Sequence, residues 1–244
     1  MKDNFSTGSA SYKQFRPEYP ETFFTYLYSL VAEYDKAWDC GTGNGQMADV
    51  LSRRFKEVVA TDISSQQLAQ ATPRENILYL KEEADHTSAP DHCYDLITVA
   101  QAIHWFDFDA FYNEVRRTAK AGAILAVTGY GLMETEGPLN AVIADFYYNT
   151  VGPYWDKERR YIDERYKTIP FPFNEIQTPE FFIHVDWDLQ QLIGYLRTWS
   201  AVKHYTTAQQ EDPIELIIPA LQQAWKAKGS VRFSFPLLLR VANL

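Results

Sequence analysis

The chain has 244 residues, of which 46% are hydrophobic, enough for one large domain with a full core. Its formal net charge of −9 argues against a nucleic-acid partner, because nucleic acids bind basic faces. The two cysteines make no disulfide framework or zinc site, and no apolar run approaches the roughly 18 residues of a membrane helix. The first twelve residues hold no leader-like apolar segment, so we expect a cytoplasmic protein without a membrane partner.

Helical and strand patterns alternate along the first half of the chain. The expected helices span 20–34, 46–55, 64–71 and 107–119, and the expected strands span 36–40, 58–62, 77–80, 94–100 and 123–127. This alternation with short links predicts an α/β fold, a Rossmann-like, doubly wound sheet with helices on both faces.

The alternation stops after Tyr130. Residues 134–180 hold five of the 12 prolines and many aromatic residues, so we expect an inserted cap or lid there. Beyond the cap, Pro236 disfavours a central position for the last strand. The strands expected in this part span 181–187 and 231–241, and the helices span 189–202 and 213–226. The prediction is one domain over 1–244, with a seven-stranded, mostly parallel sheet and a helical lid insertion.

A glycine-rich loop, WDCGTGNGQ at 38–46, lies between a predicted strand and a predicted helix. Open α/β sheets bind nucleotides at this place. The dinucleotide fingerprint requires glycine at position 46, where this chain has Gln46. Asp39 precedes the first glycine by two residues, and Asp62 ends the next strand, where a carboxylate can accept both hydroxyls of a ribose. Asp85 follows the third strand and is suitably placed for an adenine amino group.

These motifs resemble the cofactor motifs of class I S-adenosylmethionine-dependent methyltransferases. The segments 9–20, 99–107 and 194–205 are similar to the small-molecule, type-11-domain branch that includes trans-aconitate methyltransferase. The resemblance implies S-adenosylmethionine as cofactor and S-adenosylhomocysteine as product. The cofactor contacts expected on this basis are Asp39, Gly41, Thr42, Gly43, Gly45, Gln46, Asp62, Ile63, Asp85, His86, Gln101 and Ala102.

Methyl transfer is an in-line displacement in which the enzyme mainly aligns the reacting groups and excludes water. A carboxylate acceptor needs no base, but it needs a group such as arginine to orient it. His104 follows the strand 94–100 and is a candidate base or hydrogen-bond donor, with structural packing as the alternative. The resemblance implies that Tyr12 and Arg16, in an N-terminal lid arm over 1–20, reach the site; a solvated arm is the alternative.

Acceptor-pocket candidates come from the predicted cap and from the segments after the strands. On a helix, residues 157, 160 and 161 share a face, so we expect Arg160 and Tyr161 to face the acceptor. The alternative is a solvated face whose basic residues pair with the acids around them. The further wall candidates, each with core packing as its alternative, are Trp105, Tyr130, Tyr195, Trp199 and His204.

The function expected from these features is O-methylation of a small carboxylate resembling trans-aconitate. A lipid, quinone or protein acceptor is one alternative, and a binding module that senses the cofactor without turnover is another. The five histidines show no ligand spacing, so no metal is expected. Two or more guanidinium groups beside the methyl group would favour a carboxylate, and an aromatic slot would favour a lipid or ring acceptor. The sequence does not indicate the oligomeric state.

Overall fold

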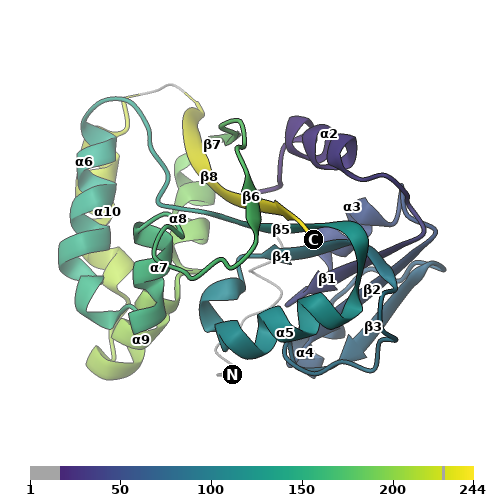
Figure 1. Cartoon of the computed structure of the whole chain (residues 1–244). Coiled ribbons are helices and arrows are strands. Elements are labelled where there is room, and N and C mark those ends of the chain that lie inside the picture. The colour runs from purple at the N-terminus through teal and green to yellow at the C-terminus, as the bar shows by residue number, and fades with distance from the viewer. Residues whose placement is uncertain (1–16, 227–228) are drawn as a thin grey trace.

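The computed structural model describes residues 17–226 and 229–244, and within these ranges eight strands join in the order β3-β2-β1-β4-β5-β8-β6, with β7 also paired to β8 (Figure 1). Neighbours among the first five strands are parallel, and every pairing of β8 is antiparallel. The strands are β1 (Lys36–Cys40), β2 (Glu57–Asp62), β3 (Ile77–Lys81), β4 (Tyr94–Ala100), β5 (Ala119–Tyr130), β6 (Asn174–Ile176), β7 (Phe182–Trp187) and β8 (Val231–Asn243). The predicted α/β fold is confirmed, with the short β6 as a strand beyond the expected seven.

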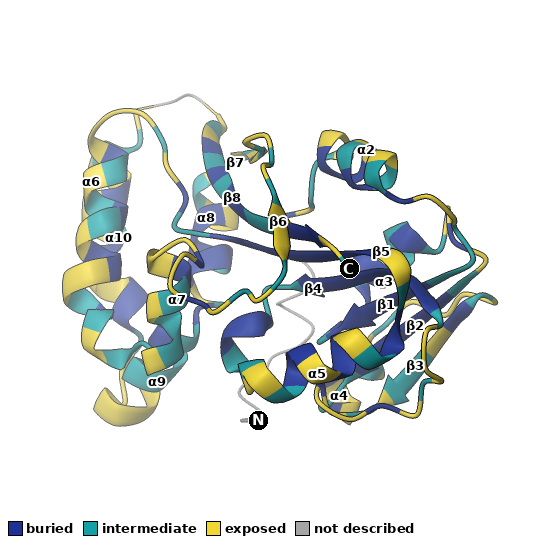
Figure 2. Cartoon of the chain, viewed as in Figure 1, coloured by how far each residue is buried: buried dark blue, intermediate teal, exposed yellow. Residues whose placement is uncertain are grey.

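Helices cover both faces of the sheet because neighbouring residues of each buried strand point to opposite faces. Ala37 packs in a core with α2 and α3, whereas Trp38 packs in a second core with α5. Figure 2 shows the buried strands between these layers. The longer helices and the short α4 and α7 are α2 (Glu21–Leu30), α3 (Gln46–Leu51), α4 (Ser65–Leu68), α5 (Phe108–Thr118), α6 (Pro138–Asp145), α7 (Arg160–Asp163), α8 (Leu189–Leu196), α9 (Ser200–Gln209) and α10 (Pro213–Ala224).

Pro236 lies where β8 changes its partners. The pairing with β7 ends at Phe182 opposite Pro236, and the pairing with β5 begins at Tyr130 opposite Leu237. A proline has no N–H to donate to a ladder, so the change of partner is a position that tolerates it. This explains how a strand containing proline takes a place inside the sheet.

Several expected helices are shorter in the structure, and one of them is divided. The helix predicted over 189–202 is two helices, α8 and α9, because Trp199 has extended backbone angles (φ −64°, ψ 135°) and is buried. The helix expected over 64–71 is the shorter α4, and Ser64 caps it, since the Ser64 side chain accepts a hydrogen bond from the N–H of Gln67.

A layer of helices stands beside the sheet (Figure 1). α6 and the turns that follow it, at 146–150, Gly152–Tyr154 and Lys157–Arg159, pack with α8, α9 and α10. The predicted cap therefore divides: its first part joins this layer, and β6 joins the edge of the sheet. Among the described residues, no helix combines the length and apolar character required to cross a bilayer.

Candidate active site

A cavity lies at the carboxyl ends of β1, β2 and β4, the edge where open α/β sheets bind their ligands. Its empty space, including the open mouth, is about 970 Å³. Pro17 and Tyr19 close it from the N-terminal side. The predicted cofactor residues that line it are Gly41, Thr42, Gly43, Gln46, Asp62, Ile63, Gln101 and Ala102.

Two of the loop glycines are required by their backbone angles and close neighbours. Gly41 has φ +69°, and a Cβ added there would lie 2.6 Å from the Cβ of Ala102. Gly45 has φ +81°, and its added Cβ would lie 2.6 Å from the hydroxyl of Tyr79. An L-residue is strained in this left-handed region and would also clash. Gly45 does not line the cavity, so it shapes the loop instead.

Asp39 is fully buried beneath the loop and does not line the cavity. Its carboxylate accepts hydrogen bonds from the hydroxyls of Thr42 and Thr98, the latter at 3.0 Å. Burial, opposed by these hydrogen bonds, raises the pKa of Asp39 to about 6. The expected direct contact of Asp39 with the cofactor is thus replaced by a supporting role, in which it holds the loop from below.

Asp62 ends β2 and faces the same cavity. One carboxylate oxygen accepts the N–H of Gly43 at 2.8 Å, and the other accepts the N–H of Ser64 at 2.8 Å. These bonds fix the carboxylate against the glycine loop. The carboxylate also lines the cavity, where its oxygens face a ligand as acceptors.

The segment after β3 contributes different residues from those expected. Asp85 and His86 are exposed and do not line the cavity, whereas Glu82 and Ala84 do. A bridge between Glu83 and His86 closes a tight turn, which places Asp85 at its tip. Sequence spacing alone does not reveal this turn.

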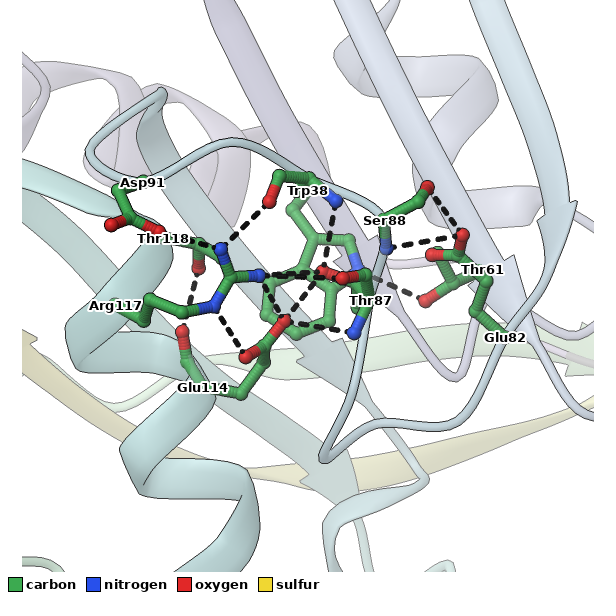
Figure 3. Close-up of polar contacts among 10 residues, drawn as sticks. Trp38, Thr61, Glu82, Thr87, Ser88, Asp91, Glu114, Arg117 and Thr118 are labelled. Atoms are coloured by element: carbon green, nitrogen blue, oxygen red, sulfur yellow. Dashed lines mark hydrogen bonds and ion pairs between the residues drawn. The ribbon is translucent and has the colours of Figure 1, made fainter.

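Glu114 of α5 anchors this segment to the core (Figure 3). Its Oε1 accepts the N–H of Thr87 at 2.9 Å and the Thr87 hydroxyl at 2.6 Å, and Arg117 donates to both of its oxygens. Burial alone would raise the pKa of Glu114, but the bonds from Arg117 and Thr87 outweigh it and hold that pKa below its ordinary value. The anchored segment carries the cavity wall at Ala84.

The polar groups of the cavity fit S-adenosylmethionine. The Nδ2 of Asn44 and the Oε2 of Glu82 are buried in its wall, and no described residue forms a hydrogen bond with either. Buried polar atoms normally have partners, so these two are available to a ligand with its own donors and acceptors. Together with Asp62, Glu82 makes the wall acidic, which suits a cation. We therefore expect Asp62 to hold the ribose and the loop to hold the amino-acid end.

A second cavity adjoins the first, since Gln101, Trp105 and Tyr130 line both. The predicted wall residues Tyr195 and Trp199 line it, as does His104. Tyr12 and Arg16, also predicted for this region, lie outside the described residues. Residues that the sequence analysis did not single out as pocket walls complete the lining: Trp155, Asp156, Arg159, Ile162, Thr198 and Ser200.

Gln101 is held in an unusual conformation where the two cavities meet. Its φ is +57°, its N–H donates to the carbonyl of Thr128 at 2.9 Å, and its side-chain amide donates to the carbonyl of Tyr130 at 3.0 Å. Left-handed angles at a residue other than glycine cost free energy and are concentrated at functional sites.

His104 is buried, with 6% of its surface exposed. Its ring packs against that of Trp105 at 5.0 Å between centroids, and its Nδ1 lies 3.5 Å from the hydroxyl of Tyr166. The ring is therefore packed in the core and also lines the second cavity. This position is compatible with both expectations for His104, structural packing and a role beside the acceptor.

Arg159, rather than Arg160, lines the second cavity. Arg160 is exposed, and its guanidinium lies over the ring of Tyr161, which also stays outside the cavity. The prediction assumed one continuous helix over 157–161. The chain instead forms a single 3₁₀ turn followed by the four-residue α7. The tighter 3₁₀ winding places Arg159, rather than Arg160, toward the cavity.

Comparison with known proteins agrees with this geometry. Residues 38–127 match a family model described as a methyltransferase domain. A candidate methyltransferase of Dictyostelium discoideum is 33% identical over 228 residues, which cover 92% of this chain and 87% of that protein. The structure of a candidate type II methyltransferase from Anaeromyxobacter dehalogenans is 35% identical with a TM-score of 0.87, covering 94% of this chain and 98% of that one.

A more distant structure supports the fold alone. The Haemonchus contortus phosphoethanolamine N-methyltransferase 2, solved with S-adenosylhomocysteine, is 16% identical with a TM-score of 0.50, covering 98% of this chain and 58% of that one. The glycine loop, the Asp62 carboxylate and the near full-length relatives lead to one conclusion. The chain belongs to the S-adenosylmethionine-dependent methyltransferases, and S-adenosylmethionine is its cofactor.

Proposed function

We propose that the acceptor is a small molecule that binds in the second cavity and is methylated on a carboxylate oxygen. The observation that carries this proposal is the wall shared by the two cavities, formed by Gln101, Trp105 and Tyr130. When bound, S-adenosylmethionine supplies a methyl group on a positively charged sulfur that is already an activated leaving group. The shared wall aligns the acceptor with that group and excludes water. A cytoplasmic site of action remains part of this proposal.

Arg159 is suited to orient the carboxylate. It is the one guanidinium among the described residues that line the second cavity, where five aromatic side chains also lie. One arginine does not meet the expectation of two or more guanidinium groups for a polycarboxylate such as trans-aconitate, so the proposal is restricted to an acid with one carboxylate. The aromatic walls favour an acceptor with a planar, apolar body.

The test is the chemical stability of the methylated product. The purified protein is incubated with methyl-labelled S-adenosylmethionine and a panel of small carboxylic acids with planar bodies. A methyl ester releases its label as methanol under mild alkali, so alkali-labile product is expected. Product that keeps its label in alkali would contradict carboxylate methylation. Formation of S-adenosylhomocysteine in the same assay separates an enzyme from a sensing module.

Methylation of an acidic hydroxyl is a second candidate, favoured by the position of His104 in the wall of the second cavity. A hydroxyl is protonated at neutral pH, so this reaction requires a base, whereas a carboxylate does not. His104→Gln should then reduce kcat by about 10²-fold or more and remove the acidic limb of the pH–rate profile. Under carboxylate methylation, the profile of this variant keeps the shape of the wild-type profile.

A further inference from the structure

Asp156 and Arg159 bring opposite charges into the second cavity without pairing to each other. Asp156 precedes a 3₁₀ turn that Arg159 ends, and the only bond between the two residues is from the Arg159 N–H to the Asp156 carbonyl. Opposite charges three residues apart usually pair when both side chains are free to do so. Their separation here therefore needs a physical reason for each residue.

Arg159 is held by other partners. Its Nε donates to the hydroxyl of Tyr147 at 2.7 Å, and that hydroxyl donates to Asp163. Its guanidinium lies 4.5 Å from the ring centre of Trp155. No residue in the described part of the chain bonds its two terminal nitrogens. The side chain is 21% exposed and fixed, with one edge engaged and the other left for an anionic group.

Asp156 lacks a hydrogen-bond donor. Its Oδ2 is buried, and none of the residues described in the structure donates to it. The nearest cation candidate is His204, whose Nδ1 lies 3.9 Å away and already donates to the carbonyl of Tyr154 at 2.9 Å. A buried carboxylate oxygen without a donor destabilises the folded state, and such groups in native structures call for an explanation. A ligand with an N–H group would supply the missing donor.

We propose that the acceptor is a small zwitterion with a planar, apolar body. Arg159 holds its anionic group, Asp156 holds its ammonium group, and Trp155 and Trp199 contact its body. The proposal rests on the proposed function, because it specifies the acceptor of that methyl transfer. Arg159 keeps its contacts with Tyr147 and with Asp163, whose Oδ1 lies 3.8 Å from its Nε, in either case. An acceptor with only one of the two charges leaves either the Oδ2 of Asp156 without a donor or the terminal nitrogens of Arg159 without an acceptor, which lowers the affinity for that acceptor.

The test measures binding rather than turnover. The protein is saturated with S-adenosylhomocysteine, which has no methyl group to transfer, and binding is followed by calorimetry and tryptophan fluorescence. The probes are phenylalanine, tyrosine and tryptophan, each with its carboxylate-only counterpart (the arylpropionate) and its amine-only counterpart (the arylethylamine). For at least one ring, the amino acid should bind about tenfold or more tightly than both counterparts. Equal or weaker binding of all three amino acids, or no binding of any probe, would overturn the proposal.

Two variants identify the groups responsible. Asp156→Asn should lower the affinity for the amino acid to that of the arylpropionate, and Arg159→Gln should lower it to that of the arylethylamine. Glu158→Gln and Arg160→Gln are matched controls, because neither side chain lines the cavity. The controls should keep the wild-type affinity, and all four variants should keep wild-type affinity for S-adenosylhomocysteine. Equal losses for all probes in Asp156→Asn would show a structural role and contradict the assignment.

The two proposals fail in different ways. The binding measurements need no methyl transfer, so the zwitterion can be refuted while an uncharged or singly charged acceptor is methylated. Conversely, selective binding of the amino acid without formation of S-adenosylhomocysteine from S-adenosylmethionine would refute the proposed function and leave the binding assignment intact.

Discussion

The two cavities of this chain share a wall but are built in different ways. The cofactor cavity is built around the glycine loop at the ends of parallel strands, with Asp62 bonded directly to that loop. Apart from the shared wall, the second cavity is lined by side chains from short helical turns, from the end of α8 and from the start of α9. A binding site at a sheet edge is therefore positioned by the fold itself, whereas a site lined by single turns depends on individual side chains.

Asp62→Ala should have the largest effect, and it should be confined to the cofactor cavity. The substitution removes the acceptors of two loop N–H groups and the carboxylate facing the cavity. Hydrogen bonds to charged groups contribute about 1.5–3 kcal/mol each, so the affinity for S-adenosylhomocysteine should fall by about 10²-fold or more. Calorimetry checks this result. Glu75→Ala, at an exposed site outside the cavity, should bind as the wild type does, and equal losses in both would contradict the role of Asp62.

The fold and most of the cofactor cavity could be predicted because their signals lie in contiguous sequence. The strand 94–100 can be predicted with its observed bounds, since a strand covered on both faces is mostly apolar. Gly41 and Gly45 were identifiable because only glycine suits their backbone angles and close neighbours. Asp62 was identifiable because it ends the strand beside the loop.

The remaining site residues could not be predicted from local pattern. Arg159 and Arg160 are adjacent arginines in one basic segment, and only the break from a 3₁₀ turn to α7 decides which one faces the cavity. Asp85 follows the third strand at a spacing suitable for an adenine contact. The bridge between Glu83 and His86 instead places it at the exposed tip of a turn, outside the cavity. Asp156 lies in a segment of mixed charges that is typical of a solvated helix face. The burial of its Oδ2 depends on tertiary packing, which the local sequence does not reveal.

A pH titration distinguishes the buried support of the glycine loop from a surface acid. The pKa of Asp39 is raised from 3.8 to about 6 by burial, so the folded state without ligand binds this proton more tightly than the unfolded state. The Asp39 contribution to stability is therefore greatest below about pH 4 and is lost as the pH rises to about 7, a change of about 3 kcal/mol. Asp39→Asn should remove this part of the pH dependence.

The measurement is the free energy of unfolding by denaturant at several values between pH 4 and pH 7. The wild type should lose stability relative to Asp39→Asn over this interval. Asp91→Asn, at an exposed acid paired with Arg117, provides the comparison and should not reproduce the effect. A difference between wild type and Asp39→Asn that is constant with pH would contradict a raised pKa at this position.

Gly41→Ala tests whether close packing, rather than chemistry, shapes the cofactor cavity. The new Cβ would meet the Cβ of Ala102 at 2.6 Å in a left-handed backbone, so the loop or the segment after β4 must shift. Left-handed angles cost an alanine about 1–2 kcal/mol, and we expect about a tenfold or greater loss of affinity for S-adenosylhomocysteine. Gly131→Ala is the matched control, because nothing lies within 4 Å of its added Cβ. Unchanged affinity in Gly41→Ala would contradict the packing argument.

Tyr147→Phe should have the smallest effect, and it should appear only at the second cavity. Tyr147 does not line either cavity, but its hydroxyl links Arg159 to Asp163. Without this link the guanidinium keeps its charge and its stacking on Trp155, but it loses its fixed direction. A hydrogen bond of this kind contributes about 1 kcal/mol, so the KM for the acceptor should rise about three- to tenfold, while the affinity for S-adenosylhomocysteine stays unchanged.

The control for this last prediction is Tyr148→Phe, since Tyr148 is 62% exposed and adjacent in sequence. Steady-state kinetics with the acceptor found by the esterification assay, together with calorimetry for the cofactor product, checks both sides of the comparison. A rise in KM that Tyr148→Phe matches would show that the effect comes from the helical layer in general. A loss of cofactor affinity in Tyr147→Phe would show that the two cavities are coupled through their shared wall, because no bond from Tyr147 reaches the glycine loop.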